Sequence, residues 1–252
     1  MSASPPVILV TGAARRIGAA IARLLHAAGA CIALHYRASA AEAQALADEL
    51  NGERAGSALT VAADLCDSAA LPPLIETVVA HFGRLDALVN NASSFFATPL
   101  GAIDARAWHE LMGSNLQGPL FLAQAAATHL AASPLEGGGA IVNITDIHAE
   151  RPLAGYTLYC AAKGGLLTLT RALAIELAPR VRVNAVAPGA IAWPENEHDF
   201  PPAERQAIIA HTLLGRIGEP LDIARTVRFL IFDAPYVTGQ TINVDGGRTA
   251  HL

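Results

Sequence analysis

Short, wholly apolar segments alternate with helical stretches along the chain, and this alternation restricts the fold more than any other feature. Residues 7–10 read Val-Ile-Leu-Val, as expected of a strand that is buried on both faces. Residues 17–29 follow as a predicted helix, with Ile17, Ile21 and Leu24 on one apolar stripe and Gly29 as its stop signal. The same pattern predicts further strands near residues 31–35, 58–62, 87–90, 140–145, 182–186 and 241–244.

Strands that alternate with helices form parallel sheets, because each helix carries the chain back to the end of the sheet where the strands begin. We therefore predict a single α/β domain over residues 1–252. It should contain a Rossmann-type, doubly wound parallel sheet of about seven strands, in the order 3-2-1-4-5-6-7, flanked by helices. A Pro/acid-rich stretch at 190–202 interrupts the alternation and is too irregular to predict as a helix.

The composition excludes several classes of protein. Hydrophobic residues make up 52 % of the chain and charged residues 15 %, which excludes a disordered protein. The net charge of −5 disfavours binding to nucleic acid, and no uncharged apolar stretch is long enough to predict a membrane span. Three widely spaced cysteines, no signal peptide and no histidine metal motif predict a cytoplasmic protein without a metal site.

A glycine-containing turn follows the first predicted strand, where dinucleotide-binding domains hold a pyrophosphate. Gly12 and Gly18 lie within the segment Thr-Gly-Ala-Ala-Arg-Arg-Ile-Gly, so their spacing differs from Gly-x-Gly-x-x-Gly. The alternative is an ordinary turn between a strand and a helix. The position directly after the first strand favours a turn whose backbone N–H groups face phosphate.

The end of the second predicted strand indicates which dinucleotide binds. An NAD-selective site places an acid there for the ribose 2′-hydroxyl, whereas a 2′-phosphate requires cations. Residues 35–39 read His-Tyr-Arg-Ala-Ser, and no acid occurs before Glu42. Arg37 offers a planar donor group suited to phosphate, so NADPH is favoured, although a solvated surface arginine is the alternative. Asp64, after the third strand, could contact the base of the cofactor or cap the next helix.

Tyr159 and Lys163 stand four residues apart in a predicted helix, so the phenol and the ammonium group share one face. A nearby cation favours the tyrosinate and so lowers the pKa of a phenol, which is ordinarily about 10. Such a pair can act as a general acid. Taken alone, however, the spacing fits an amphipathic helix with one surface lysine better than a catalytic pair.

Several short motifs are weak evidence singly but together indicate a protein family, because of the order in which they occur along the chain. These are the turn at 11–18, Asn90-Asn91-Ala92, Asn115, the Tyr159/Lys163 pair, Pro188-Gly189 and Asp245-Gly246-Gly247. With them, nearly the whole chain resembles the short-chain dehydrogenase/reductase family. The resemblance implies that Tyr159 is the general acid, that Lys163 holds the nicotinamide ribose and lowers the pKa of Tyr159, and that Asn115 positions a relay water. It also implies a homotetramer built on long helices near residues 105–130 and 155–177.

Three departures from the usual family pattern resemble the pteridine reductase branch. Arg16 and Ser93 stand where most members have glycine, and Asp146 stands where most have serine, thirteen residues before the tyrosine. The run over residues 90–100, Asn-Asn-Ala-Ser-Ser-Phe-Phe-Ala-Thr-Pro-Leu, also resembles that branch. The resemblance implies that Arg16 reaches the cofactor phosphates and the pterin, that Ser93 hydrogen-bonds both, and that Phe95 stacks on the pterin.

Asp146 decides the predicted substrate class. A serine hydroxyl is sufficient to polarise a ketone, whereas a carboxylate suits the amino and N–H donors of a pterin and can pass a proton through Tyr159 or water. The alternative for Asp146 is a strand-end acid that caps the following turn. The family resemblance implies that the loop at 190–203 closes over the substrate. Its Trp193 could line the pocket mouth or pack beneath the loop, and Leu153 and Tyr156 could also face the pocket.

We predict an NADPH-dependent pteridine reductase that transfers hydride to dihydropterin or dihydrofolate substrates, with oxidised pterins as further candidate substrates. Its predicted partner is this small-molecule pterin or folate, and neither nucleic acid nor a membrane is a predicted partner. A carbonyl or 3-oxoacyl-thioester reductase shares every cofactor feature, but Asp146 and Ser93 disfavour it. A non-catalytic NADPH sensor has no need of the Tyr159, Lys163 and Asn115 set.

The predicted catalytic residues are Asp146, Tyr159, Lys163 and Asn115. The predicted cofactor-binding residues are Gly12, Arg15, Arg16, Ile17, Gly18, His35, Tyr36, Arg37, Ser39, Asp64, Leu65, Asn91, Ala92, Ser93, Tyr159, Lys163, Pro188 and Gly189. The predicted substrate-binding residues are Arg16, Ser93, Phe95, Asp146, Tyr159 and Trp193.

Overall fold

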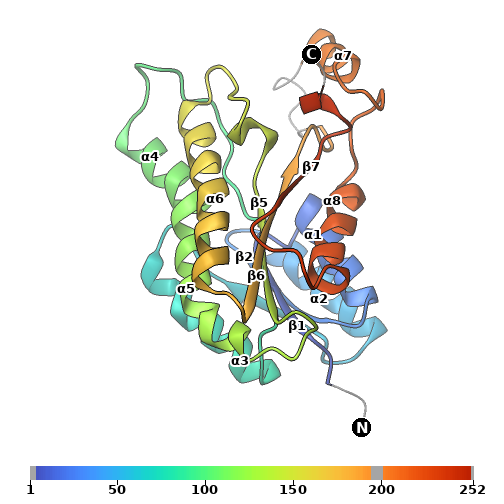
Figure 1. Cartoon of the computed structure of the whole chain (residues 1–252). Helices are drawn as coiled ribbons and strands as arrows, with labels where there is room; N and C mark the ends of the chain where they lie inside the picture. The colour runs from blue at the N-terminus through green and yellow to red at the C-terminus, as the bar shows by residue number, and fades with distance from the viewer. Residues whose placement is uncertain (1–3, 194–200, 251–252) are drawn as a thin grey trace.

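A parallel sheet forms the centre of the molecule in the computed structural model, which describes residues 4–193 and 201–250 (Figure 1). Within these ranges seven strands pair in the order β3-β2-β1-β4-β5-β6-β7, which confirms the predicted fold class and strand order. The strands are β1 (Val7–Val10), β2 (Cys31–Tyr36), β3 (Ala58–Ala62), β4 (Ala87–Asn90), β5 (Gly139–Ile144), β6 (Val181–Pro188) and β7 (Thr241–Val244).

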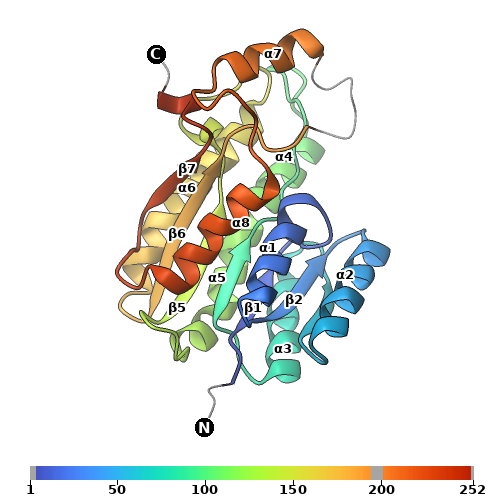
Figure 2. The same cartoon turned by 90° about the vertical axis from the view of Figure 1, so that its right-hand side faces the viewer.

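Helices cover both faces of the sheet. One layer contains α1 (Arg16–Ala27), α2 (Ala40–Glu53) and α8 (Pro220–Arg228), and the opposite layer contains α3 (Leu71–Phe82), α5 (Gly118–Ala131) and α6 (Thr157–Glu176) (Figures 1 and 2). Each layer packs a separate apolar cluster against the sheet. All four residues of β1 are buried, because this strand lies between the two clusters. Among the described helices, none combines the length and apolar character needed to cross a membrane.

The chain builds the sheet outward from β1 in both directions, and this position determines where a ligand can bind. β1 pairs with β2 on one side and with β4 on the other. The loop after β1 leads to α1 on one face of the sheet, and the loop after β4 leads towards α5 on the opposite face. Thr11, directly after β1, accepts hydrogen bonds from the backbone N–H groups of Asn91 and Ala92, directly after β4, at 2.9 and 3.0 Å. A crevice at this point is the usual ligand site of an open α/β sheet.

A π-helical turn, Gly113–Gln117, joins α4 (Ala105–Met112) to α5. The turn lies tightly against the loop after β3. A Cβ atom on Gly113 would lie 2.7 Å from the Sγ atom of Cys66, and one on Gly118 would lie 2.9 Å from the Cβ atom of Leu65. Asn115, in the middle of the turn, is completely buried. π-Helical turns occur frequently at functional sites.

The predicted substrate loop at 190–203 is only partly described. Residues 194–200 lie outside the described residues. After them, α7 (Pro202–Ala210) begins within the stretch that the sequence indicates as irregular. This helix lies beyond the carboxyl ends of the strands (Figure 1).

Candidate active site

A cavity of about 890 Å³ opens at the carboxyl ends of the central strands. It draws its walls from the turn after β1, the ends of β2 to β6, and α6 and α7. Its volume lies near the upper end of the roughly 300–1,000 Å³ range of small-molecule sites. The predicted residues that line it are Gly12, Arg15, Arg16, Ile17, Gly18, His35, Arg37, Asp64, Leu65, Asn91, Ala92, Ser93, Phe95, Asp146, Tyr159, Lys163, Pro188, Gly189 and Trp193. Leu153 also lines it, whereas Tyr156 does not.

Three predicted site residues, Tyr36, Ser39 and Asn115, are not among the residues that line this cavity. The hydroxyl of Ser39 accepts a hydrogen bond from Nη2 of Arg15 at 2.9 Å, so it contacts a cavity residue. Asn115 lies behind the wall, and its Oδ1 atom accepts a hydrogen bond from the Ser93 hydroxyl at 2.7 Å. Any role of the Asn115 side chain in this site is therefore exerted through its neighbours.

The turn after β1 has the properties of a phosphate cradle. Gly12 has a φ angle of +61°, and a Cβ atom on Gly18 would lie only 2.1 Å from the carbonyl oxygen of Gly12. The turn and the start of α1 therefore pack together without space for side chains. The first turn of α1 contains no acidic residue, and no side chain caps its N-terminus. The N–H groups at this helix end are thus suited to an anion such as a pyrophosphate.

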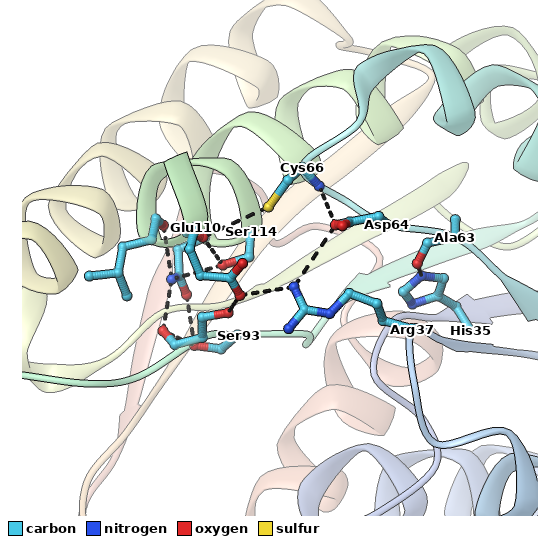
Figure 3. A network of polar contacts seen from close by, with 11 residues as sticks. His35, Arg37, Ala63, Asp64, Cys66, Ser93, Glu110 and Ser114 are labelled. Atoms are coloured by element: carbon cyan, nitrogen blue, oxygen red, sulfur yellow. Dashed lines mark hydrogen bonds and ion pairs between the residues drawn. The ribbon is translucent and has the colours of Figure 1, made fainter. Parts of the chain in front are cut away.

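His35 is hydrogen-bonded to this turn. Its Nδ1 atom accepts a hydrogen bond from the backbone N–H of Gly12 at 3.2 Å, and its Nε2 atom lies 3.1 Å from the carbonyl oxygen of Ala63 (Figure 3). This pattern requires a neutral ring with its proton on Nε2. Burial favours the neutral form and lowers the pKa of His35 to about 4. His35 is therefore built into the cradle rather than exposed in the cavity.

Arg37 and Asp64 both line the cavity and lie close together (Figure 3). Nη1 of Arg37 lies 2.9 Å from Oε1 of Glu110 on α4 and 3.9 Å from Oδ1 of Asp64. The carboxylate of Asp64 accepts a hydrogen bond from the backbone N–H of Cys66. The helical turn that follows is capped by Asp67, so the capping alternative for Asp64 is wrong.

The two carboxylate oxygens of Asp146 have different partners. Oδ2 accepts a hydrogen bond from the Tyr159 hydroxyl at 2.7 Å, and Oδ1 accepts one from the backbone N–H of His148 at 2.8 Å. Asp146 therefore caps the turn that follows β5 and at the same time faces Tyr159. The two alternatives raised by the sequence are both realised in one side chain.

Charges around Tyr159 favour its neutral form in this structure. Burial raises the pKa of Tyr159 well above 10, and the Asp146 carboxylate raises it further. Lys163 donates a hydrogen bond to the carbonyl oxygen of Ile144 at 2.8 Å, and its Nζ atom lies 5.8 Å from the centre of the Tyr159 ring. Burial lowers the pKa of Lys163 to about 8. The direction at Tyr159 is opposite to the expected lowering, because Asp146 contacts the hydroxyl and Lys163 does not.

Aromatic side chains border the cavity beside Tyr159. Phe95 stacks on Tyr156 at 4.6 Å between ring centres and meets Tyr159 edge-on at 4.8 Å. Arg16 and Ala192 also line the cavity, and Nη2 of Arg16 donates a hydrogen bond to the carbonyl oxygen of Ala192 at 2.9 Å. Arg16 has a φ angle of +51°, which explains why glycine is common at this position in the family that the sequence resembles.

The cavity is also lined by residues that were not predicted from the sequence. Most come from α7, from the segment after β6, or from a short turn near the C-terminus, and no local motif marks them. Among the described residues, no group of His, Cys, Asp and Glu side chains is arranged to hold a metal ion. The additional lining residues are Ser94, Ser114, Ile144, Thr145, His148, Ala190, Ile191, Ala192, Glu204, Ala207, Ile208, His211 and Arg248.

Comparison with known proteins relates this site to a group of reductases. A family described as "Enoyl-(Acyl carrier protein) reductase" matches residues 12–249. "Pteridine reductase 1" of Leishmania tarentolae is 40 % identical, over 98 % of this chain and 98 % of that protein. A "3-oxoacyl-[acyl-carrier-protein] reductase" of Synechocystis is 39 % identical, over 96 % of each chain. A "3beta-hydroxysteroid dehydrogenase 1" of Eggerthella lenta is 33 % identical, over 97 % of this chain and 94 % of that protein.

Proposed function

Because this chain belongs to the short-chain dehydrogenase/reductase family of oxidoreductases, we propose that it is an NADPH-dependent pteridine reductase acting on dihydropterin or dihydrofolate substrates. The observation that carries this proposal is the 2.7 Å hydrogen bond from Tyr159 to Asp146 inside the cavity. A carboxylate beside the proton donor can accept hydrogen bonds from the amino and N–H groups of a pterin ring. A ketone has no such donors.

The residues present fit a dinucleotide with a 2′-phosphate. The turn containing Gly12 and Gly18 would hold the pyrophosphate, Arg37 the 2′-phosphate, and Lys163 the ribose next to the nicotinamide. NADPH, when bound, supplies the hydride. The NADPH preference follows from the absence of an acid at the end of β2.

Protein groups then supply the proton. A phenol is protonated near neutral pH, and the raised pKa of Tyr159 favours that form further, so its hydroxyl carries a proton before the reaction begins. The carboxylate of Asp146 fixes the direction of that hydroxyl. After Tyr159 has given up its proton, the carboxylate can take a proton from water and pass it to the phenolate. The ring of Phe95, which is 43 % exposed, offers an aromatic surface at the cavity edge on which a pterin would stack. Trp193, which belongs to the loop at 190–203 that is proposed to close over the substrate, lines the same cavity.

The relative from Leishmania tarentolae supports the pterin proposal, since its name assigns it to pteridine reduction. A 3-oxoacyl-thioester reductase is the second candidate, because a relative of nearly equal identity is named for that activity. Both activities use the same cofactor region. They differ in what the proton donor and its neighbour must bind, so Asp146 is the residue that separates them.

Assays of NADPH oxidation coupled to substrate reduction test the proposal directly. NADPH consumption is measured with dihydrobiopterin, dihydrofolate and acetoacetyl thioester, for the wild type and for Asp146→Ser. We expect the wild type to reduce a pterin, and the variant to lose about a hundredfold in kcat/KM for it while keeping its affinity for NADPH. Turnover of the thioester without pterin turnover would establish the second candidate instead.

Two further variants separate chemistry from folding at Asp146. Asp146→Asn keeps an oxygen that can cap the turn at His148 but removes the negative charge. It should lose pterin activity almost as completely as Asp146→Ser. Asp67→Ser alters an equivalent cap at Ala69, away from the cavity, and should leave pterin turnover close to that of the wild type. If Asp146→Asn kept full pterin activity, the role proposed for the carboxylate would be wrong.

We also propose that the chain is one domain that works in the cytoplasm as a homotetramer. Ile175 on α6, Trp108 on α4 and Leu120 on α5 are exposed, and an interface on this side of the molecule would cover them. Cys31, Cys66 and Cys160 are free thiols, which suits a reducing compartment. Light scattering of the purified protein tests the tetramer, and a monomer at micromolar concentration would contradict it.

A further inference from the structure

Arg37, the proposed ligand of the 2′-phosphate, already has an acidic partner in this structure. Its Nη1 atom donates a hydrogen bond to Oε1 of Glu110 at 2.9 Å, and Oδ1 of Asp64 lies 3.9 Å away (Figure 3). Arg37 and Glu110 are 73 residues apart in the chain, so only the fold brings them together. An incoming 2′-phosphate would therefore meet a cation whose charge is already balanced by carboxylates.

Glu110 is the fixed member of this pair. The same Oε1 atom that meets Arg37 also accepts a hydrogen bond from the hydroxyl of Ser94. The carbonyl oxygen of Ser94 in turn accepts a hydrogen bond from the amide of the fully buried Asn115 at 3.0 Å. Glu110 also stands on α4, and its side chain is 28 % exposed, against 50 % for Arg37 on a loop. Movement on cofactor binding thus falls to Arg37.

We propose that Glu110 is a specificity-determining residue: it competes with the 2′-phosphate of NADPH for Arg37 and so limits the preference for NADPH over NADH. This inference rests on the proposed use of NADPH. A partly exposed ion pair contributes little free energy, so a phosphate that binds the arginine through two hydrogen bonds can displace it. The displaced carboxylate remains near the phosphate and repels it. NADH carries a neutral 2′-hydroxyl in place of this phosphate, so it neither needs the charge of Arg37 nor is repelled by the carboxylate.

The variant Glu110→Gln tests this competition. Glutamine has the same size and keeps an oxygen that can accept from Ser94 and Arg37, but it carries no charge. Dissociation constants for NADPH and NADH are measured by fluorescence titration at low ionic strength. We expect NADPH to bind about fivefold more tightly than to the wild type, which corresponds to about 1 kcal/mol, and NADH to bind with unchanged affinity.

Two controls show whether the effect passes through Arg37. In Arg37→Met, which removes the cation, adding Glu110→Gln should raise NADPH affinity by much less than fivefold, because only the direct repulsion by the carboxylate is relieved. Glu49→Gln removes the same charge from the exposed pair between Arg23 and Glu49, outside the cavity, and should change neither affinity.

Each other outcome is decisive. Weaker or unchanged NADPH binding in Glu110→Gln would overturn the competition. A parallel gain for NADH would assign the effect to general electrostatics. If the wild type bound NADH at least as tightly as NADPH, the proposed cofactor itself would fail, which is distinguishable from a failure at Glu110 alone.

Discussion

At the level of single residues, the proposed chemistry depends on which neighbour of a side chain is nearest. The Tyr159 hydroxyl contacts the Asp146 carboxylate at 2.7 Å, whereas Lys163 directs its ammonium group to the carbonyl oxygen of Ile144. The positions of Tyr159 and Lys163 on one helical face are predictable from their spacing. The direction of the pKa change at Tyr159 is not, because it depends on distances of a few ångströms between segments far apart in the chain.

A buried neutral histidine gives the fold a dependence on pH. The pKa of His35 is lowered to about 4, so between pH 4 and 6.5 the unfolded chain binds a proton here that the folded chain does not. The free energy of unfolding should therefore fall as the pH falls through this range, by about 3 kcal/mol in total from this group. Above pH 6.5 the contribution is constant. Urea denaturation at several pH values between 4.5 and 7.5 measures the slope.

The variant His35→Asn tests the assignment to this residue. Asparagine places an oxygen near the position of Nδ1, so it can still accept from the Gly12 N–H, but it does not titrate. The curve of unfolding free energy against pH should be flatter for the variant than for the wild type. If the two curves were parallel, the pH dependence would have to arise elsewhere.

At the level of elements, most of the fold is predictable because the strands are short apolar runs with clear ends. The predicted strand at 58–62 matches β3, and the predicted helix at 17–29 differs from α1 by one or two residues at each end. The start of α7 is not predictable in this way, because it follows a Pro/acid-rich segment without helical periodicity. Glu110 could not be predicted as a site residue for a related reason. It occupies an ordinary helical position, and its proposed role depends on contact with Arg37, which is 73 residues away in the chain.

Two glycines in helices provide a matched test of the phosphate cradle. A Cβ atom on Gly18 would lie 2.1 Å from the carbonyl oxygen of Gly12, whereas one on Gly52 in α2 would have no neighbour within 4 Å. We expect Gly18→Ala to lose about 2–4 kcal/mol of stability and most NADPH affinity, because backbone must move. Gly52→Ala should gain about 0.5–1 kcal/mol. Thermal unfolding and NADPH titration of both variants would check this, and equal behaviour would contradict the close packing described here.

At the level of the whole molecule, distant parts of the chain line one cavity. If the protein is one domain, these parts unfold together. Its walls extend from Gly12 near the N-terminus to Arg248 near the C-terminus. The polar residues at the centre of the site can be predicted from sequence motifs. The residues of α7 that line the cavity cannot, because they belong to no recognisable motif. Ligand binding should therefore stabilise the entire fold rather than one segment.

Thermal unfolding with and without dinucleotide measures this stabilisation. At a free NADPH concentration of about one hundred times its dissociation constant, the folded state should gain about 2.7 kcal/mol. For a chain of this length the midpoint should rise by about 5–10 °C. NADH at the same concentration should raise it less. Equal shifts with the two dinucleotides would contradict the proposed recognition of a 2′-phosphate.

The π-helical turn Gly113–Gln117 has a consequence for how this region can change during evolution. A helix advances by about 100° for each residue. Removing one residue from the turn would convert it to a regular helix and rotate all of α5 by that angle relative to α4. The apolar stripe of α5, including Leu122 and Ala126, would then turn away from the sheet. Insertions and deletions in this region should therefore be tolerated far less readily than substitutions.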